Sequence, residues 1–272
     1  MRAKTSEQMY LDLLMRCLVN WVYLEAETRP VLPRKLAFLL QVATGGLRIT
    51  VPRKVDPEKR KFGEDWPVFG HSMVGLKRLE NLRHCIEDVL ANNIPGDLLE
   101  AGVWRGGTCI FMRGMLKVYG VTDRKVWVCD SFKGLPIPNL TKYPADRKSM
   151  FFLARSLAVS LETVRANFAK YELLDDQVVI SQGWFKDTLP TLPVEQLSVL
   201  RLDGDMYEST MDTLSSLYPK LSKGGYVIID DYAIPACRSA VHDYRSRRQI
   251  TEKIIEQEGG VTFWKRQADK ID

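Results

Sequence analysis

Residues 98–107 read LLEAGVWRGG, and this stretch decides the fold class. An apolar run that ends in Glu100 is typical of a buried strand, and the glycines after it indicate a sharp turn into a helix over 107–119. The turn is not GxGxxG, because Trp104 occupies the second glycine position, and no Gly-Lys-[Ser/Thr] follows to make a P-loop. Such a turn suits a ligand without pyrophosphate, such as S-adenosylmethionine, whose carboxylate can meet amides at the helix start. The alternative is that the glycines are purely structural.

The same alternation of strand and helix continues on both sides of this stretch. We expect strands at 98–101, 126–130, 177–181, 198–202 and 226–230, and helices at 73–92, 107–119, 161–172, 207–221 and 236–249. A terminal hairpin is expected to pair 251–255 with 262–265. The pattern predicts an α/β fold of the class I methyltransferase type, which is Rossmann-like, with a mostly parallel seven-stranded sheet and an antiparallel terminal hairpin.

The N-terminal region carries a different pattern. Helical periodicity covers 6–28, a second short helix is expected at 34–43, and 44–70 is interpreted as an irregular linker. We therefore divide the chain into an N-terminal helical extension with its linker, 1–70, and a catalytic domain, 71–272. The segment 133–157 contains three prolines and many polar residues, and it is expected to be irregular.

Acidic residues follow four of the predicted strands. They are Glu100, Asp130, the pair Asp203 and Asp205, and the pair Asp230 and Asp231. Because the carboxyl ends of parallel strands line one edge of an open sheet, where ligands bind, these acids are expected to converge.

Asp130 ends the strand that follows the glycine turn, where an acid can accept hydrogen bonds from both ribose hydroxyls of a nucleoside. The alternative for Asp130 is a cap at the strand end. Gln182, Gly183 and Trp184 follow the next strand, in the right place for an adenine contact, although Trp184 could equally be a core aromatic. The segment 71–75, which includes Met73, is a candidate helix start near the ligand.

Three carboxylates at one crevice would repel one another unless a cation neutralised them. Asp203, Asp230 and Asp231 are therefore candidate metal ligands, and hard oxygen donors select magnesium or calcium over zinc. The alternative is that these acids cap the helices that follow, which Asp205 or Asp231 could do. The three histidines, 71, 84 and 242, lack a spacing typical of metal ligands.

Composition excludes several classes of function. A net charge of +5 is mild and scattered, whereas a nucleic-acid surface needs clustered basic residues. The five cysteines form no CxxC pair, which favours a reducing cytoplasm over a disulfide scaffold. The apolar stretch from Met9 to Leu24 is broken by polar and charged residues, so no membrane span is expected. We expect a soluble, cytoplasmic protein without nucleic-acid or membrane partners.

Five motifs, in order, resemble those of the macrocin O-methyltransferase family, the TylF/MycF-type sugar methylases of macrolide biosynthesis. They are EAGVWRGGTCIFMRG, VWVCDSFKGLP, GWFKDTLP, RLDGDMYESTMDTL and GGYVIIDDY, and the resemblance covers about residues 70 to 266. It implies transfer of a methyl group from S-adenosylmethionine to a hydroxyl of a sugar on a glycosylated small molecule, with Mg²⁺ held by Asp203, Asp230 and Asp231. It also implies that 133–157 is a variable loop over the acceptor.

The candidate cofactor residues, from the patterns and the resemblance together, are Met73, Glu100, Ala101, Gly102, Trp104, Gly106, Thr108, Asp130, Ser131, Phe132, Gln182, Gly183, Trp184 and Asp203. Trp104, Phe132 and Trp184 are candidates to shield the cationic methyl donor. Asp203 is the candidate catalytic base, which takes the proton from the attacking hydroxyl.

Rival functions stay open at this point. A catechol-type phenol O-methyltransferase would use the same three aspartates. A nicotinamide-dependent oxidoreductase shares the fold class but lacks its glycine fingerprint here, and a protein that binds S-adenosylmethionine without catalysis is a third possibility. The apolar N-terminal helix would make a reasonable subunit contact, so we expect a homo-oligomer.

Overall fold

A computed structural model of the chain describes residues 3–30, 36, 43–44, 49–257 and 260–268. Its centre is a seven-stranded sheet in the order β5-β4-β3-β6-β7-β9-β8. The strands are β3 (Asp97–Ala101), β4 (Val126–Asp130), β5 (Val178–Gln182), β6 (Leu197–Leu202), β7 (Leu221–Ile229), β8 (Ile255–Glu256) and β9 (Thr262–Lys265). The first five are parallel and the last two are antiparallel, as the sequence predicted.

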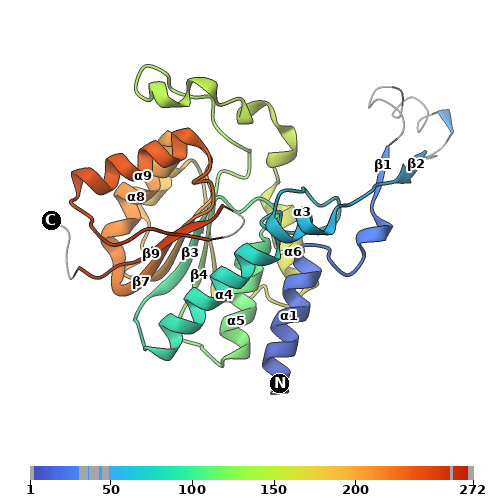
Figure 1. Ribbon diagram of the computed structural model, residues 1–272, viewed down its shortest axis with the longest axis horizontal. Coiled ribbons are helices and arrows are strands. Elements are labelled where there is room, and N and C mark those ends of the chain that lie inside the picture. The colour runs from blue at the N-terminus through green and yellow to red at the C-terminus, as the bar shows by residue number, and fades with distance from the viewer. Residues whose placement is uncertain (1–2, 31–35, 37–42, 45–48, 258–259, 269–272) are drawn as a thin grey trace.

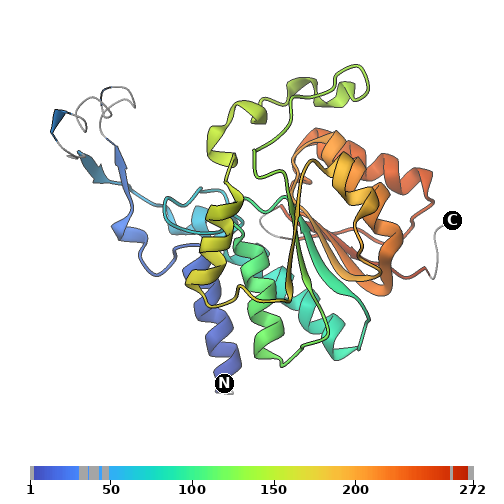
Figure 2. The same ribbon diagram turned by 180° about the vertical axis from the view of Figure 1, so that it is seen from behind.

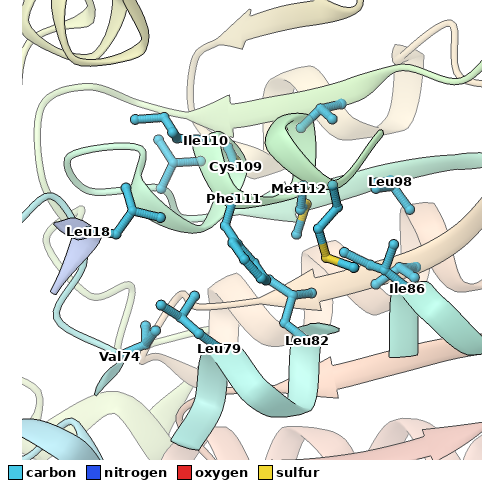
Figure 3. Packing of buried hydrophobic residues seen from close by; sticks show 14 of the residues in the cluster. Leu18, Val74, Leu79, Leu82, Ile86, Leu98, Cys109, Ile110, Phe111 and Met112 are labelled. Carbon is cyan, nitrogen blue, oxygen red and sulfur yellow. The ribbon is translucent and has the colours of Figure 1, made fainter. Parts of the chain in front are cut away.

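Helices cover both faces of this sheet (Figures 1 and 2). The α-helices of the described residues are α1 (Ser6–Leu18), α3 (Pro57–Phe62), α4 (Gly75–Ala91), α5 (Gly107–Val118), α6 (Leu161–Lys170), α7 (Phe185–Thr188), α8 (Tyr207–Leu217) and α9 (Pro235–Arg247). Alternate side chains of a strand point to opposite faces, so Leu98 joins the core beneath α4 and α5, whereas Leu99 joins the core beneath α8 and α9. Figure 3 shows the first of these cores, in which Phe111 lies between α5 and α4.

The predicted helix over 6–28 is too long. The helix ends at Leu18, and Asn20 takes a left-handed conformation (φ 52°). The amide of Asn20 then donates a hydrogen bond to the buried carboxylate of Glu27 at 2.9 Å, which folds the chain back. The chain continues into β1 (Thr28–Pro30), which pairs antiparallel with β2 (Thr50–Pro52). These strands were not predicted, and the helix expected at 34–43 lies almost entirely outside the described residues.

The linker predicted at 44–70 is only partly irregular. It contains α3, which begins at an Asp56 cap with Pro57 in the first turn and ends at Gly63 (φ 76°). These are ordinary start and stop signals for a helix that the mixed charge of the stretch had concealed. Helix α1 packs against α5 within the same hydrophobic core. The boundary at residue 70 stays a prediction.

Further element boundaries differ from the prediction. The first arm of the terminal hairpin, predicted at 251–255, is the two-residue strand β8, Ile255–Glu256. Helix α8 ends at Leu217 rather than at 221, because Pro219 follows within a short 3₁₀ turn and cannot continue the helix. Strand β7 begins at Leu221, five residues before the predicted start, with a register shift against β6. The segment 133–157 contains three short 3₁₀ helices, Pro144–Lys148, Phe151–Leu153 and Arg155–Leu157. No helix among the described residues has both the length and the apolar character needed to cross a membrane.

Candidate active site

One cavity of about 600 Å³ lies at the carboxyl ends of the parallel strands. Twelve of the predicted site residues line it: Met73, Glu100, Gly102, Trp104, Thr108, Asp130, Ser131, Gly183, Trp184, Asp203, Asp230 and Asp231. The convergence expected at this sheet edge is therefore confirmed. Four candidates do not line the cavity, namely Ala101, Gly106, Phe132 and Gln182. Of these, Ala101 and Phe132 are buried in the two cores, whereas Gln182 is exposed.

The glycine turn after β3 needs a residue without a side chain at Gly102. Its φ is +93°, and a Cβ there would lie 1.8 Å from the backbone oxygen of Asp203. The turn after β3 therefore touches the loop after β6 directly. At the start of α5, the Gly107 N–H donates to the backbone oxygen of His71 at 3.0 Å, which holds the 71–74 wall of the cavity against the helix.

Asp130 joins two loops rather than capping a helix. Its Oδ2 accepts the N–H of Val103 at 2.8 Å, and its Oδ1 accepts the N–H of Phe132 at 2.7 Å. Burial raises the pKa of Asp130, although these backbone hydrogen bonds act in the opposite direction. Each carboxylate oxygen has two lone pairs, so Asp130 can still accept hydrogen bonds from a diol in the cavity.

Two of the three candidate aromatics remain able to face a cation. Phe132 is excluded because it is buried in the core beneath α5. Trp104 lines the cavity, but the guanidinium of Arg105 already lies 4.1 Å from its ring centroid. Trp184 also lines the cavity, so the alternative in which it is only a core residue is wrong.

Asp203, Asp230 and Asp231 meet at one point. One oxygen from each lies within 4.8 Å of the others. The helix-cap alternative is wrong, because Met206 and Ile234 occupy the N-cap positions of α8 and α9, and neither Asp205 nor Asp231 caps these helices. Asp231 instead accepts the backbone N–H of Asp205 at 2.8 Å.

Burial and mutual repulsion raise the pKa values of Asp203, Asp205 and Asp231. Burial, followed by the charge of Asp230, raises the pKa of Asp203 to about 8 and that of Asp205 to about 6. Burial and the neighbouring Asp205 raise the pKa of Asp231 well above its ordinary value. Crowded carboxylates with hard oxygen donors are the ligand set that Mg²⁺ or Ca²⁺ accepts, so the residues present fit a divalent cation.

Sequence reasoning missed a buried arginine at the centre of this site. The guanidinium of Arg201 on β6 forms ion pairs with Glu100, with Asp230, and with Asp203 at 2.8 Å. These carboxylates hold the pKa of Arg201 well above its ordinary value, although burial alone would lower it. Arg78 of α4 also contacts Asp230, at 2.5 Å.

The carboxylate of Glu100 is buried, and its oxygens are occupied by contacts with other side chains of the protein. Besides Arg201, it accepts hydrogen bonds from the Thr108 hydroxyl and from the Cys109 thiol, the latter at 2.9 Å. A signal for this cluster was present in the sequence. Arg201 is a lone cation within an apolar strand, and it must find a buried acid; in the sheet its register partner is Glu100.

Comparisons with known proteins agree with this geometry. The profile of the macrocin-O-methyltransferase (TylF) family matches residues 7–266. Mycinamicin III 3''-O-methyltransferase of Micromonospora griseorubida is 48% identical over 98% of this chain and 100% of its own length. Demethyldecarbamoylnovobiocin O-methyltransferase of Streptomyces niveus is 47% identical over 96% of this chain and 95% of its own.

Solved structures place the fold in the same class. The O-methyltransferase NovP is 47% identical, with a TM-score of 0.85 over 97% of this chain and 100% of its own. The calicheamicin methyltransferase CalS11 has a TM-score of 0.56 at 19% identity over 97% of this chain and 94% of its own, which supports the fold alone. The chain therefore belongs to the macrocin-O-methyltransferase (TylF) family and is an S-adenosylmethionine-dependent O-methyltransferase of the class I fold.

Proposed function

We propose that this protein methylates a sugar hydroxyl of a glycosylated natural product and that Mg²⁺ bound by Asp203, Asp230 and Asp231 is required. The observation that carries the proposal is the meeting of these three carboxylates beside the glycine turn, inside one cavity. A relative 48% identical over 97% of this chain and 94% of its own, from Streptomyces olivaceus, supports the acceptor class. It is named as a 4'-O-methyltransferase of a rhamnosyl-tetracenomycin.

The residues of the chain divide the work as follows. The amides around Gly102 and the start of α5 bind the methyl donor, and Asp130 accepts hydrogen bonds from its ribose. When bound, Mg²⁺ would supply the positive charge that lowers the pKa of an acceptor hydroxyl. Holding donor and acceptor in attack geometry can remove about 7–11 kcal/mol from the barrier.

The proton of the attacking hydroxyl needs an acceptor, and Asp203 is the proposed base. Its carboxylate lines the cavity, but it is also an ion-pair partner of Arg201. Asp205 lines the same cavity two residues further on and is the alternative base. Separate substitutions by Asn distinguish the two. Substitution of the base abolishes turnover even when Mg²⁺ is saturating. Substitution of a residue that acts only as a metal ligand lowers turnover, and additional Mg²⁺ partly restores it.

A panel of acceptors tests the substrate class. Purified enzyme with S-adenosylmethionine and Mg²⁺ is offered rhamnosides and other deoxyglycosides, their free aglycones, and simple catechols. Methyl transfer to a glycoside hydroxyl, with no transfer to catechols, is expected. Transfer to catechols alone would replace this proposal with the phenol O-methyltransferase reading.

Chelation tests the metal. We expect EDTA to abolish methyl transfer and added Mg²⁺ to restore it, because the hydroxyl is a weak nucleophile without a nearby dication. Full activity after exhaustive chelation would exclude the proposed metal role while leaving the acceptor class untouched.

A further inference from the structure

The segment 133–157, hereafter the covering segment, is attached to the cofactor side of the cavity at both its ends. Near its start, the Ser131 hydroxyl donates to the backbone oxygen of Gly134 at 2.8 Å. Near its end, the Trp104 indole N–H donates to the backbone oxygen of Ser156 at 2.9 Å. Figures 1 and 2 show the segment, in light green, extending away from the sheet between these points.

The middle of the covering segment is held to the start of α8, across the cavity, by hydrogen bonds to one residue, Asp146. Asp146 is fully buried, and its two carboxylate oxygens accept the N–H groups of Tyr207 at 2.7 Å and Glu208 at 3.1 Å. These are the first two residues of α8. The buried Tyr143 adds a ring contact with Tyr207, at 5.8 Å between centroids.

Helix α8 depends on this contact because it has no cap of its own. Its N-cap position is Met206, which offers no side-chain acceptor. A carboxylate at a helix N-terminus satisfies free amides and interacts favourably with the helix dipole. The residues just before Met206 are the loop that carries Asp203 and Asp205, so Asp146 contacts the helix that fixes the end of this acidic loop.

We propose that Asp146 is a positioning residue, which couples the covering segment to the acidic loop, so that acceptor binding and the geometry of Asp203 and Asp205 depend on the same buried carboxylate. The inference rests on the proposed function. The two walls that Asp146 joins both line the cavity, with Asn139 and Lys142 from the segment and Glu208 from α8. A glycoside held between these walls would meet the acidic loop only while they stay together.

The test uses the variants Asp146→Ala and Asp146→Asn, with Asp243→Asn as the matched control. Asp243 is an exposed acid that accepts a hydrogen bond from the hydroxyl of the same Tyr207, at 2.8 Å. Trypsin is the first probe, because Arg147 and Lys148 follow Asp146 directly and are exposed. The second probe is calorimetry with S-adenosylhomocysteine, and the third is the KM and kcat for a glycoside acceptor.

For Asp146→Ala we expect cleavage at Arg147 or Lys148 to accelerate about tenfold or more, in line with the loss of about 1.4 kcal/mol of local stability. Acceptor KM should rise and kcat should fall, while S-adenosylhomocysteine affinity stays unchanged. Asp146→Asn retains one acceptor oxygen and should lie between Ala and native, and Asp243→Asn should match the native protein.

Native cleavage rates in both Asp146 variants would overturn the proposal. So would a general loss of cofactor affinity together with unfolding in Asp146→Asn, because the role would then be purely structural. The proteolysis readout needs no acceptor. It therefore stands even if the acceptor panel shows that the proposed sugar substrate is wrong.

Discussion

The two halves of the sheet edge are built on different physical principles. The cofactor half, after β3 and β4, is held by backbone: a glycine turn in contact with the next loop, and Asp130 bonded to two main-chain amides. The acidic half, after β6 and β7, is held by charge. Glu100, Asp203 and Asp230 surround the guanidinium groups of Arg201 and Arg78, and Asp205 and Asp231 lie beside them. In the cofactor half, we expect substitutions to be harmful when they disturb the backbone. In the acidic half, we expect substitutions that change charge to be harmful and substitutions that change only shape to be tolerated.

The largest expected effect separates the two halves by function. Asp203→Ala should lower turnover by about 10²–10⁴-fold, the range for loss of a general base, and loss of a metal ligand would add to it. The affinity for S-adenosylhomocysteine should stay unchanged, because the donor is bound by the backbone half. Calorimetry and methyl-transfer assays on the same preparation measure both. A collapse of cofactor affinity would show that the halves are not separable.

The next effect tests the charge balance of the acidic half. Arg201→Met should lower the free energy of unfolding by about 3–5 kcal/mol, because Glu100 would be left buried without its cation and Asp230 would keep only Arg78 among the described residues. Lys77→Met is the control, since Lys77 pairs with the exposed Glu80 and should cost less than about 1 kcal/mol. Urea unfolding measures both. Equal costs for the two variants would contradict the charge-based account.

The backbone half is tested by adding one methyl group. Gly102→Ala should lower the free energy of unfolding by about 2–4 kcal/mol, because the new Cβ meets the Asp203 backbone and φ is positive. Gly120→Ala also places a side chain at a positive φ (+65°) but with no atom within 4 Å, and should cost about 1 kcal/mol. Thermal or urea unfolding compares them. A Gly102 variant as stable as the Gly120 variant would mean that the two loops are not in contact.

The smallest expected effect is a pH dependence of stability that comes from His71, in the 71–74 wall of the cavity beside the cofactor half. Burial, followed by Lys170 and Arg105, lowers the pKa of His71 to about 4, so this imidazole stays neutral in the folded protein. The unfolded chain takes up a proton near pH 6.5, and stability should therefore fall as pH drops from about 6.5 toward 4 and should be independent of this group above 6.5.

His71→Gln should remove part of that fall, by about 1 kcal/mol or less at pH 5.5, after allowance for solvent screening of a partly exposed ring. His84→Gln makes the same substitution at an exposed histidine and is the matched control. Urea midpoints at several pH values measure the difference. Parallel profiles for native protein and His71→Gln would show that His71 is not held neutral.

The contrast also explains what the sequence could predict. The glycine turn, Asp130 and the strand-end aspartates depend on local patterns and on the rule that strand ends share one edge, so their convergence was predictable. Arg201 is a lone cation in an apolar strand, which indicates a buried acidic partner, but the identity of that partner appears only when β6 lies beside β3. Asp146 accepts a hydrogen bond from Tyr207 of α8, 61 residues later in the chain, and no local sequence pattern predicts such a contact.

The N-terminal region was predicted least well for a similar reason. The turn at Asn20 exists because Glu27, a charged residue, is fully buried. The guanidinium of Arg60 at 3.0 Å and that of Arg53 at 2.9 Å contact Glu27. Helical periodicity alone cannot reveal a buried ion pair between distant segments, so the predicted helix was extended past its end.

Manganese binding tests the central claim most directly, because Mn²⁺ takes the same hard oxygen donors as Mg²⁺ and its free form is counted by electron paramagnetic resonance. We expect one Mn²⁺ per chain in the native protein, displaced by Mg²⁺, and none in the Asp203→Ala/Asp231→Asn double variant. Retention of that bound Mn²⁺ by the double variant would contradict the assignment of the three aspartates as the metal site.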